Sequence, residues 1–177
     1  PTPADLRLNK YESDHCLYLF TEQQDTPLAH AIGVRRSQAT NMLAGPSVTL
    51  PAGAEVDSFL IHGDSLGLGG TGAHLSGNVT FDEPILGVVV TTAGLNATDA
   101  LTGLPDISYE HVSTARGLEG PSYAGDMVAV DASDPHLLHV DIAFNVMDEI
   151  RIYTGVLPPP PPDCEPDTPG NAIVLPP

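Results

Sequence analysis

The sequence predicts an all-β fold, an antiparallel β-sandwich of the jelly-roll type, on two observations. Short segments alternate apolar and polar residues, and 17 glycines and 18 prolines punctuate the 177 residues. Alternation puts apolar side chains on one face of a strand, and many short strands separated by Gly- and Pro-rich turns are typical of sandwiches and barrels. We expect residues 1–157 to form this domain and residues 158–177 to form an extended proline-rich tail.

Three segments give strong strand signals. Residues 75–81 and 138–146 alternate, which predicts strands with one buried face. Residues 85–90 are apolar at every position except Gly87 and rich in β-branched residues. This composition predicts a strand that is buried on both faces at the centre of a sheet.

The last predicted strand, residues 149–154, has two different faces. Ile150 and Ile152 lie on one face, while Glu149, Arg151 and then Tyr153 lie on the other. We expect this strand to close the domain just before the proline run. The remaining predicted elements are strands at 17–20, 47–50, 56–62 and 127–130 and a single short helix within 28–43.

The charge balance limits the partners of the protein. The chain has 23 acidic and six basic residues, a formal net charge of -17. Such a charge repels phosphate backbones and anionic lipids, so we expect neither a nucleic-acid partner nor membrane insertion, and no run of 18 apolar residues is present. The excess carboxylate favours cations such as calcium, or simply keeps an exported protein soluble.

The start of the chain and its cysteines indicate an exported protein. The chain begins Pro-Thr-Pro without a methionine, and we expect a secreted or cell-surface protein whose signal peptide has been removed. Cys16 and Cys164 are the two cysteines and predict a disulfide in an oxidising compartment. Within one chain, the bond would stabilise the fold by roughly 5 kcal/mol. A bond between two chains is an equally open interpretation.

One motif is typical of an esterase. Residues 63–67 read Gly-Asp-Ser-Leu-Gly and satisfy G-x-S-x-G, which would make Ser65 a nucleophile with His136 as its base. A nucleophile elbow needs a helix after the serine, whereas residues 66–74 are rich in glycine. We therefore expect no enzymatic activity and keep the Ser65-dependent esterase as a second alternative.

Metal ligation is predicted only weakly. His136 and His139 are three residues apart, which on a strand places their side chains on opposite faces, so we expect no transition metal. Calcium takes hard oxygen ligands from irregular loops. Its predicted ligands are Glu12, Asp14 and Asp148, and surface carboxylates without any ion are the alternative.

Six blocks of sequence, taken in order, carry a resemblance: Asp57-Ser-Phe-Leu-Ile-His62, Leu75-Ser-Gly-Asn-Val-Thr-Phe-Asp82, Pro84-Ile-Leu-Gly-Val-Val-Val90, Arg116-Gly-Leu-Glu119, Asp126 and Asp148-Glu-Ile-Arg-Ile-Tyr-Thr154. Over about residues 8–155 the chain resembles a group of exported bacterial β-domain proteins of uncharacterised function, often with surface-sorting tails. The resemblance implies a β-domain and supplies no catalytic residues. The group tends to have Phe-Asp-Pro where this chain has Gly63-Asp64-Ser65.

Two pairs of polar residues are expected to be structural. Arg116 and Glu119 predict an ion pair within a loop, which contributes at most about 1 kcal/mol if exposed. His62 and Asp64 predict a buried hydrogen-bonded pair.

The tail favours a structural or adhesive subunit of an extracellular assembly, a filament or surface layer, in which copies of the protein join one another. A run of five prolines projects roughly 15 Å as an extended helix. A cysteine and a short apolar segment suited to strand addition follow it. The residues predicted to form the docking arm include Pro158, Pro162, Ala172, Ile173, Val174 and Leu175.

The alternative is a carbohydrate-binding module with glycans as partners. Sugars stack on exposed aromatic rings, and the chain has no tryptophan. Its five tyrosines would have to form the platform: Tyr11, Tyr18, Tyr109, Tyr123 and Tyr153.

Overall fold

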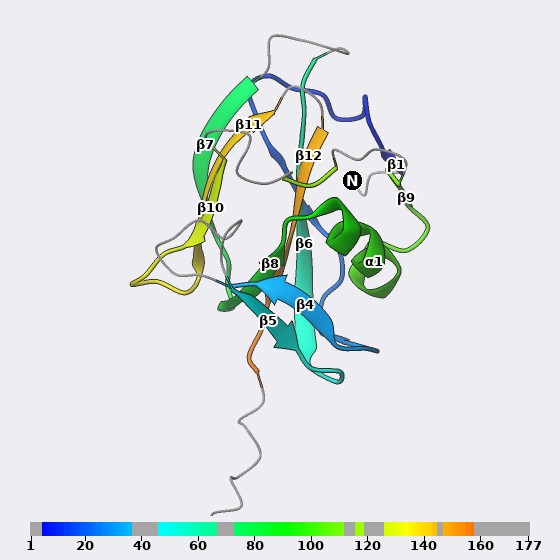
Figure 1. Cartoon of the computed structure of the whole chain (residues 1–177), viewed down its shortest axis with the longest axis vertical. Coiled ribbons are helices and arrows are strands. Elements are labelled where there is room, and N and C mark those ends of the chain that lie inside the picture. The colour runs from blue at the N-terminus through cyan, green and yellow to red at the C-terminus, as the bar shows by residue number, and fades with distance from the viewer. Residues whose placement is uncertain are drawn as a thin grey trace, which may run out of the picture.

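The computed structural model describes residues 5–36, 46–66, 73–111, 116–118, 126–144 and 147–157. Within these residues the chain is built almost entirely of strands, with one α-helix (Figure 1). The elements are β1 (Asp5–Leu6), β2 (Tyr18–Thr21), β3 (Thr26–Pro27), β4 (Ile32–Arg35), β5 (Ser47–Leu50), β6 (Glu55–Asp64), β7 (Ala73–Thr80), β8 (Ile85–Val89), α1 (Thr92–Thr102), β9 (Ser108–Tyr109), β10 (Met127–Val130), β11 (Leu137–Phe144) and β12 (Met147–Thr154).

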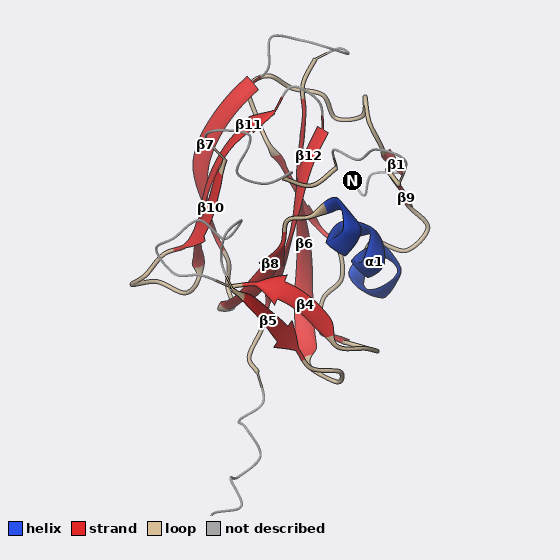
Figure 2. Ribbon diagram, viewed as in Figure 1, coloured by secondary structure: helices blue, strands red, loops and turns tan. Residues whose placement is uncertain are grey.

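Two antiparallel sheets pack together, which confirms the predicted sandwich. The larger sheet has the order β2-β6-β12-β8-β4-β5, with β3 also paired to β6, and the smaller sheet has the order β10-β11-β7. Figure 2 shows the smaller sheet over one face of the larger sheet and α1 over the other. A short parallel pair of β1 with β9 lies near α1. The larger sheet is therefore covered on both faces.

Most strands lie where alternation predicts them. β5 and β10 have the predicted bounds, and the strand predicted as buried on both faces is β8, which lies between β12 and β4. Every residue of β8 is buried. The proline-rich tail, residues 158–177, lies outside the described residues and stays a prediction.

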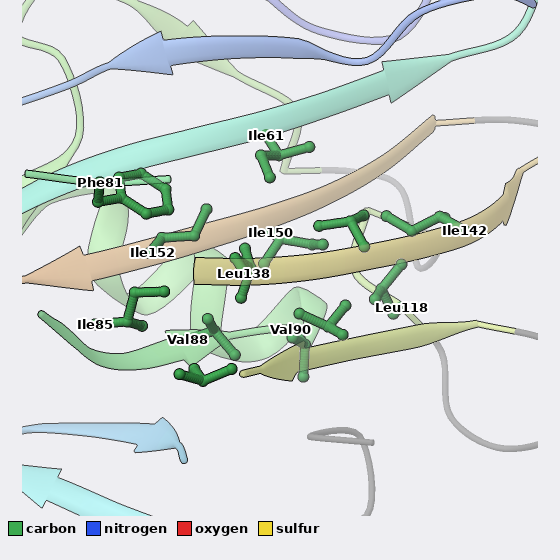
Figure 3. Close-up of a cluster of buried hydrophobic side chains, with 13 residues drawn as sticks. Ile61, Phe81, Ile85, Val88, Val90, Leu118, Leu138, Ile142, Ile150 and Ile152 are labelled. Carbon is green, nitrogen blue, oxygen red and sulfur yellow. The ribbon is translucent and has the colours of Figure 1, made fainter. Parts of the chain in front are cut away.

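The main core fills the space between the two sheets (Figure 3). Ile150 and Ile152 of β12 point toward the smaller sheet and are fully buried, as the alternation predicted. Burying such a side chain stabilises the fold by about 1.5–3 kcal/mol. The full cluster contains Ile61, Phe81, Ile85, Val88, Val90, Leu118, Val128, Val130, Leu138, Val140, Ile142, Ile150 and Ile152.

A second core lies on the opposite face of the larger sheet. Leu60 of β6, Val89 of β8 and Tyr153 of β12 pack there against Leu95 of α1 and Leu6 of β1. Successive side chains of a strand point to opposite faces, so β6, β8 and β12 each supply both cores.

The helix predicted within residues 28–43 is wrong for the described part of that range, residues 28–36. Ile32–Arg35 is a strand that pairs with β5 and β8, and residues 37–45 lie outside the described part of the chain. Branching at Cβ in Ile32 and Val34 favours an extended backbone. Both side chains are buried in the second core.

The helix that the structure does contain was not predicted. α1 begins after Thr91, whose side chain accepts a hydrogen bond from Gly94 N, and it buries Leu95, Thr98 and Thr102. Two of its three buried residues are threonines, so the sequence lacks the helical repeat of apolar residues that would have predicted it. Their hydroxyls bond to carbonyls one turn earlier, Thr98 to Gly94 O at 2.9 Å and Thr102 to Thr98 O at 3.3 Å.

Candidate functional site

The polar face of β12 is buried. Glu149, Arg151 and Tyr153 are each 0 % exposed, on the face that packs against α1. Removing a charge from water costs several kcal/mol unless it is paired and hydrogen-bonded. The charges are paired within one cluster, which we call the ion network: Glu22, His62, Asp99, Tyr109, Arg116, Glu149 and Arg151.

Arg151 ties β12 to the loop after β2 and to α1. Its Nε and Nη2 donate to the two carboxylate oxygens of Glu22 at 2.6 and 2.8 Å. The remaining donors reach Thr98 Oγ1 at 2.6 Å, Leu95 O at 3.2 Å and Asp99 Oδ1 at 2.8 Å. Burial opposes the charge, but Glu22 and Asp99 outweigh it and raise the pKa of Arg151. This guanidinium is therefore permanently charged.

Arg116 is also fully buried and is bound to α1 and β12. Its Nε donates to Glu149, and its Nη1 donates to Asn96 Oδ1 at 2.9 Å and to Asp99 Oδ2 at 2.5 Å. Burial opposes its charge, yet Asp99 and Glu149 raise the pKa of Arg116. The predicted pair of Arg116 with Glu119 stays a prediction, because Glu119 lies outside the described residues.

His62 connects the network to the loop before β2. Its Nδ1 lies 2.8 Å from Glu149 Oε1, and its Nε2 lies 2.9 Å from Lys10 O. A carbonyl oxygen only accepts, so Nε2 carries a hydrogen and the Nδ1–Oε1 bond holds a second proton. The predicted partner Asp64 is wrong, because Asp64 Oδ2 accepts from Asn9 N at 2.6 Å. His62 faces Glu149 directly across the β6–β12 ladder, which is closer than a neighbour two residues along one strand.

The charges of the network balance for either position of that second proton. With an imidazolium, three cations meet three carboxylates, and with a protonated Glu149, two cations meet two carboxylates. The cations are Arg116, Arg151 and His62, and the carboxylates are Glu22, Asp99 and Glu149.

Tyr109 of β9 completes the network. Its ring lies beneath both guanidinium groups, with Arg116 Cζ 5.0 Å and Arg151 Cζ 5.5 Å from the ring centroid. Its hydroxyl donates to Glu22 Oε1 at 2.5 Å and accepts from Leu104 N at 2.7 Å. Burial and the neighbouring Glu22 raise the pKa of Tyr109. The phenol therefore stays neutral and acts as a hydrogen-bond donor.

The ion network is suited to holding segments together. Neither Arg116 nor Arg151 has exposed surface, so neither guanidinium is presented to a ligand in this structure. At its margin, the half-exposed His111 has Nε2 3.2 Å from Asp99 Oδ2. The network joins the loop after β2 to β6, α1, β9, residues 116–118 and β12.

The structure does not bring together the residues of the predicted esterase. Ser65 is 2 % exposed, and no hydrogen bond to its Oγ is found within the described part of the chain. It follows β6, whose last residue pairs with Met147, close to the Phe144 end of β11. His136 precedes the other end of β11, eight residues away, or roughly 25 Å along a strand.

Two of the predicted calcium ligands have structural roles near the end of β6. Asp14 Oδ1 accepts a hydrogen bond from Leu66 N at 3.0 Å, and Asp148 is a β12 residue paired with Gly63. Glu12 is partly buried in the loop before β2. Over the described ranges, no three His, Cys, Asp or Glu side chains gather as a metal site. Calcium binding thus stays a prediction.

Two of the tyrosines predicted for a sugar platform are buried. Tyr109 is 7 % and Tyr153 0 % exposed, so neither can stack on a glycan, and that part of the prediction is wrong. Tyr11 is 39 % exposed and packs edge-on against Tyr18 and Phe20, with ring centroids 5.6 and 5.3 Å apart. Tyr123 lies outside the described residues.

An apolar cavity of about 210 Å³ opens between the edges of the two sheets, and we call it the edge groove. β2 is at one end of the larger sheet and β7 at one end of the smaller. Leu19 on β2 is 45 % exposed, although it lies on the same face as core residue Ile61. The groove is lined by Leu17 and Leu19, by Leu75, Gly77 and Val79, and by Ile61 and Val140, with polar residues at its rim.

Gly77 leaves a gap in the β7 wall of the edge groove. A Cβ at this position would meet no atom of the described residues within 4 Å. Gly77 shares the inward face of β7 with Leu75 and Val79, which pack against the main core. The gap therefore opens inward, toward the groove.

Cys16 lies on the rim of the same groove. It is exposed, and its Sγ is 3.1 Å from Ser13 Oγ. Cys164 lies outside the described residues, as do the arm residues Pro158, Pro162 and 172–175. The disulfide, within or between chains, stays a prediction.

No family model, curated protein or solved structure matches the chain. The resemblance to exported β-domain proteins therefore stays a prediction. In the part of the chain that the structure describes, no helix is long and apolar enough to cross a membrane.

Sequence reasoning missed both the ion network and the edge groove. A signal for the first was present, because Glu149 and Arg151 share a face of a strand at the end of a folded domain. Their partners Glu22 and Asp99 come from distant segments with no shared motif. The signal for the groove was Gly77 in the middle of an alternating strand, which often marks a close approach or a gap.

Proposed function

We propose that this protein is a non-enzymatic, secreted structural subunit of an extracellular assembly, a filament or surface layer. The sandwich is the body of the subunit, and the C-terminal arm, residues 158–177, joins it to neighbours. The observation that carries this proposal is the edge groove, an apolar opening between two strands at the edges of the described sheets.

The size and lining of the edge groove favour a strand over a small substrate. Its volume of about 210 Å³ is below the roughly 300–1,000 Å³ of typical ligand pockets. Edge strands carry free N–H and C=O groups that an added strand can pair with. Within the described strands, β7 pairs only with β11 and β2 only with β6.

The chemistry elsewhere supports a body without catalysis. The charged side chains of the ion network are bound to one another beneath α1 and are not presented to solvent. Ser65 is separated from His136 by the length of β11. A net charge of -17 keeps separate copies soluble, and physiological salt screens it over about 8 Å, so the charge does not prevent short apolar contacts between copies.

The proposal is tested by removing the arm. The chain of residues 1–177 and a chain ending at Leu157 are compared at about 0.15 M salt by sedimentation and electron microscopy. We expect ordered polymers of the 1–177 chain and folded monomers of the chain that ends at Leu157, with the same β-rich circular dichroism spectrum. Identical polymers from both chains would overturn the role of the arm.

A carbohydrate-binding module is the second candidate, favoured by the exposed Tyr11 beside Tyr18 and Phe20. A glycan array distinguishes the two functions. The array is probed with chains that do not polymerise. Glycan binding by such a chain that is lost in its Tyr11→Ala variant would favour the carbohydrate-binding module. The absence of binding to any glycan on the array would remove it.

A further inference from the structure

We infer that the edge groove is the docking site for residues 171–175 of a second copy of this chain, added as a strand beside β7. This inference rests on the proposed function, because it identifies where the arm of one subunit meets the body of the next. Three features support it: the gap at Gly77 in the wall of the groove, the length and composition of residues 171–175, and the face of the larger sheet on which Leu157 packs.

The groove has room for side chains on an added strand. β7 has eight residues and is the longer of the two edges, since β2 has four. Its inward residues Leu75 and Val79 flank the gap at Gly77, where a Cβ would meet nothing within 4 Å. An apolar side chain placed over Gly77 would contact Leu75 and Val79 on either side and Leu19 across the groove.

The arm segment fits this space in length and composition. Residues 171–175 read Asn-Ala-Ile-Val-Leu, which are five residues opposite the five from Leu75 to Val79. Alternation would place Ala172 and Val174 on one face and Ile173 and Leu175 on the other. Proline cannot donate to a ladder, so Pro169 and Pro176 limit the added strand to this segment.

The geometry favours a second copy over the chain's own groove. Leu157, the last described residue before the prolines, packs against the second core, on the α1 face of the larger sheet. The groove residues Leu17, Leu75 and Val79 pack against the main core, on the opposite face. Five prolines in an extended helix would span roughly 15 Å, a length that would let the arm reach a neighbouring copy.

Cys16 provides a chemical reporter of this contact. It lies on the groove rim, and Cys164 precedes Ala172 by eight residues, a reach of up to roughly 25 Å when extended. With oxidised glutathione as oxidant, the two thiols lose their protons and form one disulfide, and the glutathione disulfide is reduced to two glutathione thiols. The cross-link reports that the arm of one copy has reached the rim of another.

The first test fills the gap without unfolding the sandwich. Gly77→Val adds a side chain at a position where a Cβ would meet no atom of the described residues within 4 Å, and valine favours a strand more than glycine does. We expect an unchanged or higher melting temperature together with loss of polymers. Gly33→Val is the matched control, since Gly33 is an exposed β4 residue outside the groove.

The arm is tested in the same way with the full chain. Ile173→Asp with Val174→Asp places charge on both faces of the segment, whichever face points inward, and should abolish polymers as completely as deletion of 158–177. A peptide of residues 171–177 should inhibit polymerisation of the full-length chain. The same peptide with both aspartates should not.

The contact between copies is tested by mixing Cys16→Ser and Cys164→Ser chains, each with one thiol, in the presence of oxidised glutathione. We expect mixed dimers whose mapped bond joins Cys164 of one copy to Cys16 of the other. The bond should be lost when the Cys164→Ser chain also carries Gly77→Val. A cross-link that survives Gly77→Val would overturn the inference.

The outcomes separate the inference from the function. If the truncated chain is monomeric while Gly77→Val still polymerises, the arm has another docking site and this inference fails, although the proposed function stands. If the truncated chain polymerises, the role of the arm in the proposed function fails as well. If Gly77→Val and the aspartate variant both prevent polymers in folded chains, the groove is the site.

Discussion

Arg116 and Arg151 share one carboxylate oxygen, because Asp99 Oδ1 accepts hydrogen bonds from Nη2 of both guanidinium groups, at 2.9 and 2.8 Å. Asp99 lies on α1, Arg151 on β12 and Arg116 in a separate segment. One side chain of the helix thus connects α1 to both buried cations. The covering of the larger sheet by α1 depends on this connection as well as on Leu95.

The first prediction concerns this shared acceptor. Asp99→Asn keeps the shape of the side chain but leaves two buried guanidinium groups with one carboxylate fewer. We expect a loss of about 3–5 kcal/mol in the free energy of unfolding, as for breaking a buried ion pair, measured by urea denaturation. The control is Asp82→Asn, an exposed carboxylate between β7 and β8. Equal losses in the two variants would contradict a special role for Asp99.

The second prediction concerns the phenol that lies beneath both cations. Tyr109→Phe removes the donor to Glu22 and the acceptor for Leu104 N while keeping the ring. Leaving such buried groups without a partner costs about 1–3 kcal/mol. Tyr11→Phe, at an exposed position, should change the unfolding midpoint little. A stability of Tyr109→Phe equal to wild type would show that these hydrogen bonds contribute nothing net.

The third prediction concerns the pH dependence of stability. Burial raises the pKa of Asp64, although the hydrogen bond from Asn9 N partly offsets this effect. A raised carboxyl pKa means that the folded state holds its proton more tightly than the unfolded state. The contribution of Asp64 to the free energy of unfolding is therefore fully present below its unfolded-state pKa of about 3.9. It is lost as the pH rises through the pKa of the folded state.

Asp64→Asn removes this titration. We expect the variant to gain stability relative to wild type as the pH rises from about 4 toward 7, with little change in their difference below about pH 3.5. Unfolding midpoints measured across this range check it, with Asp82→Asn as the exposed control. A difference between Asp64→Asn and wild type that is constant with pH would contradict the prediction.

The fourth prediction compares two glycines in strands. At Gly87 of the central strand β8, a new Cβ would approach Val34 Cβ to 2.8 Å and Arg35 O to 3.1 Å, whereas at Gly77 it would meet nothing within 4 Å. Gly87→Ala should therefore destabilise by about 1–3 kcal/mol through overpacking. Gly77→Ala should be neutral or stabilise by roughly 0.5–1 kcal/mol. Thermal melts of the pair decide it, and a reversed order would refute the packing argument.

Strands were predictable because their signal is local. Alternation in 75–81 and the apolar run in 85–90 are properties of a few consecutive residues, and both became strands, the second at the centre of the larger sheet. The helix at 92–102 was missed because its buried face includes Thr98 and Thr102, which look polar in sequence but satisfy their hydroxyls within the helix.

The sequence by itself determined the two faces of the last strand, since side chains alternate in any extended backbone. Only the tertiary structure decided that the face with Glu149 and Arg151 is buried, because its cover, α1, and its counter-charges, Glu22 and Asp99, come from distant segments. Likewise, the sequence placed a glycine in β7, but the distance between β7 and β2 made Gly77 part of a groove. Whether a side chain is buried or borders a groove depends on which elements pack together, and no pattern within a few consecutive residues encodes this packing.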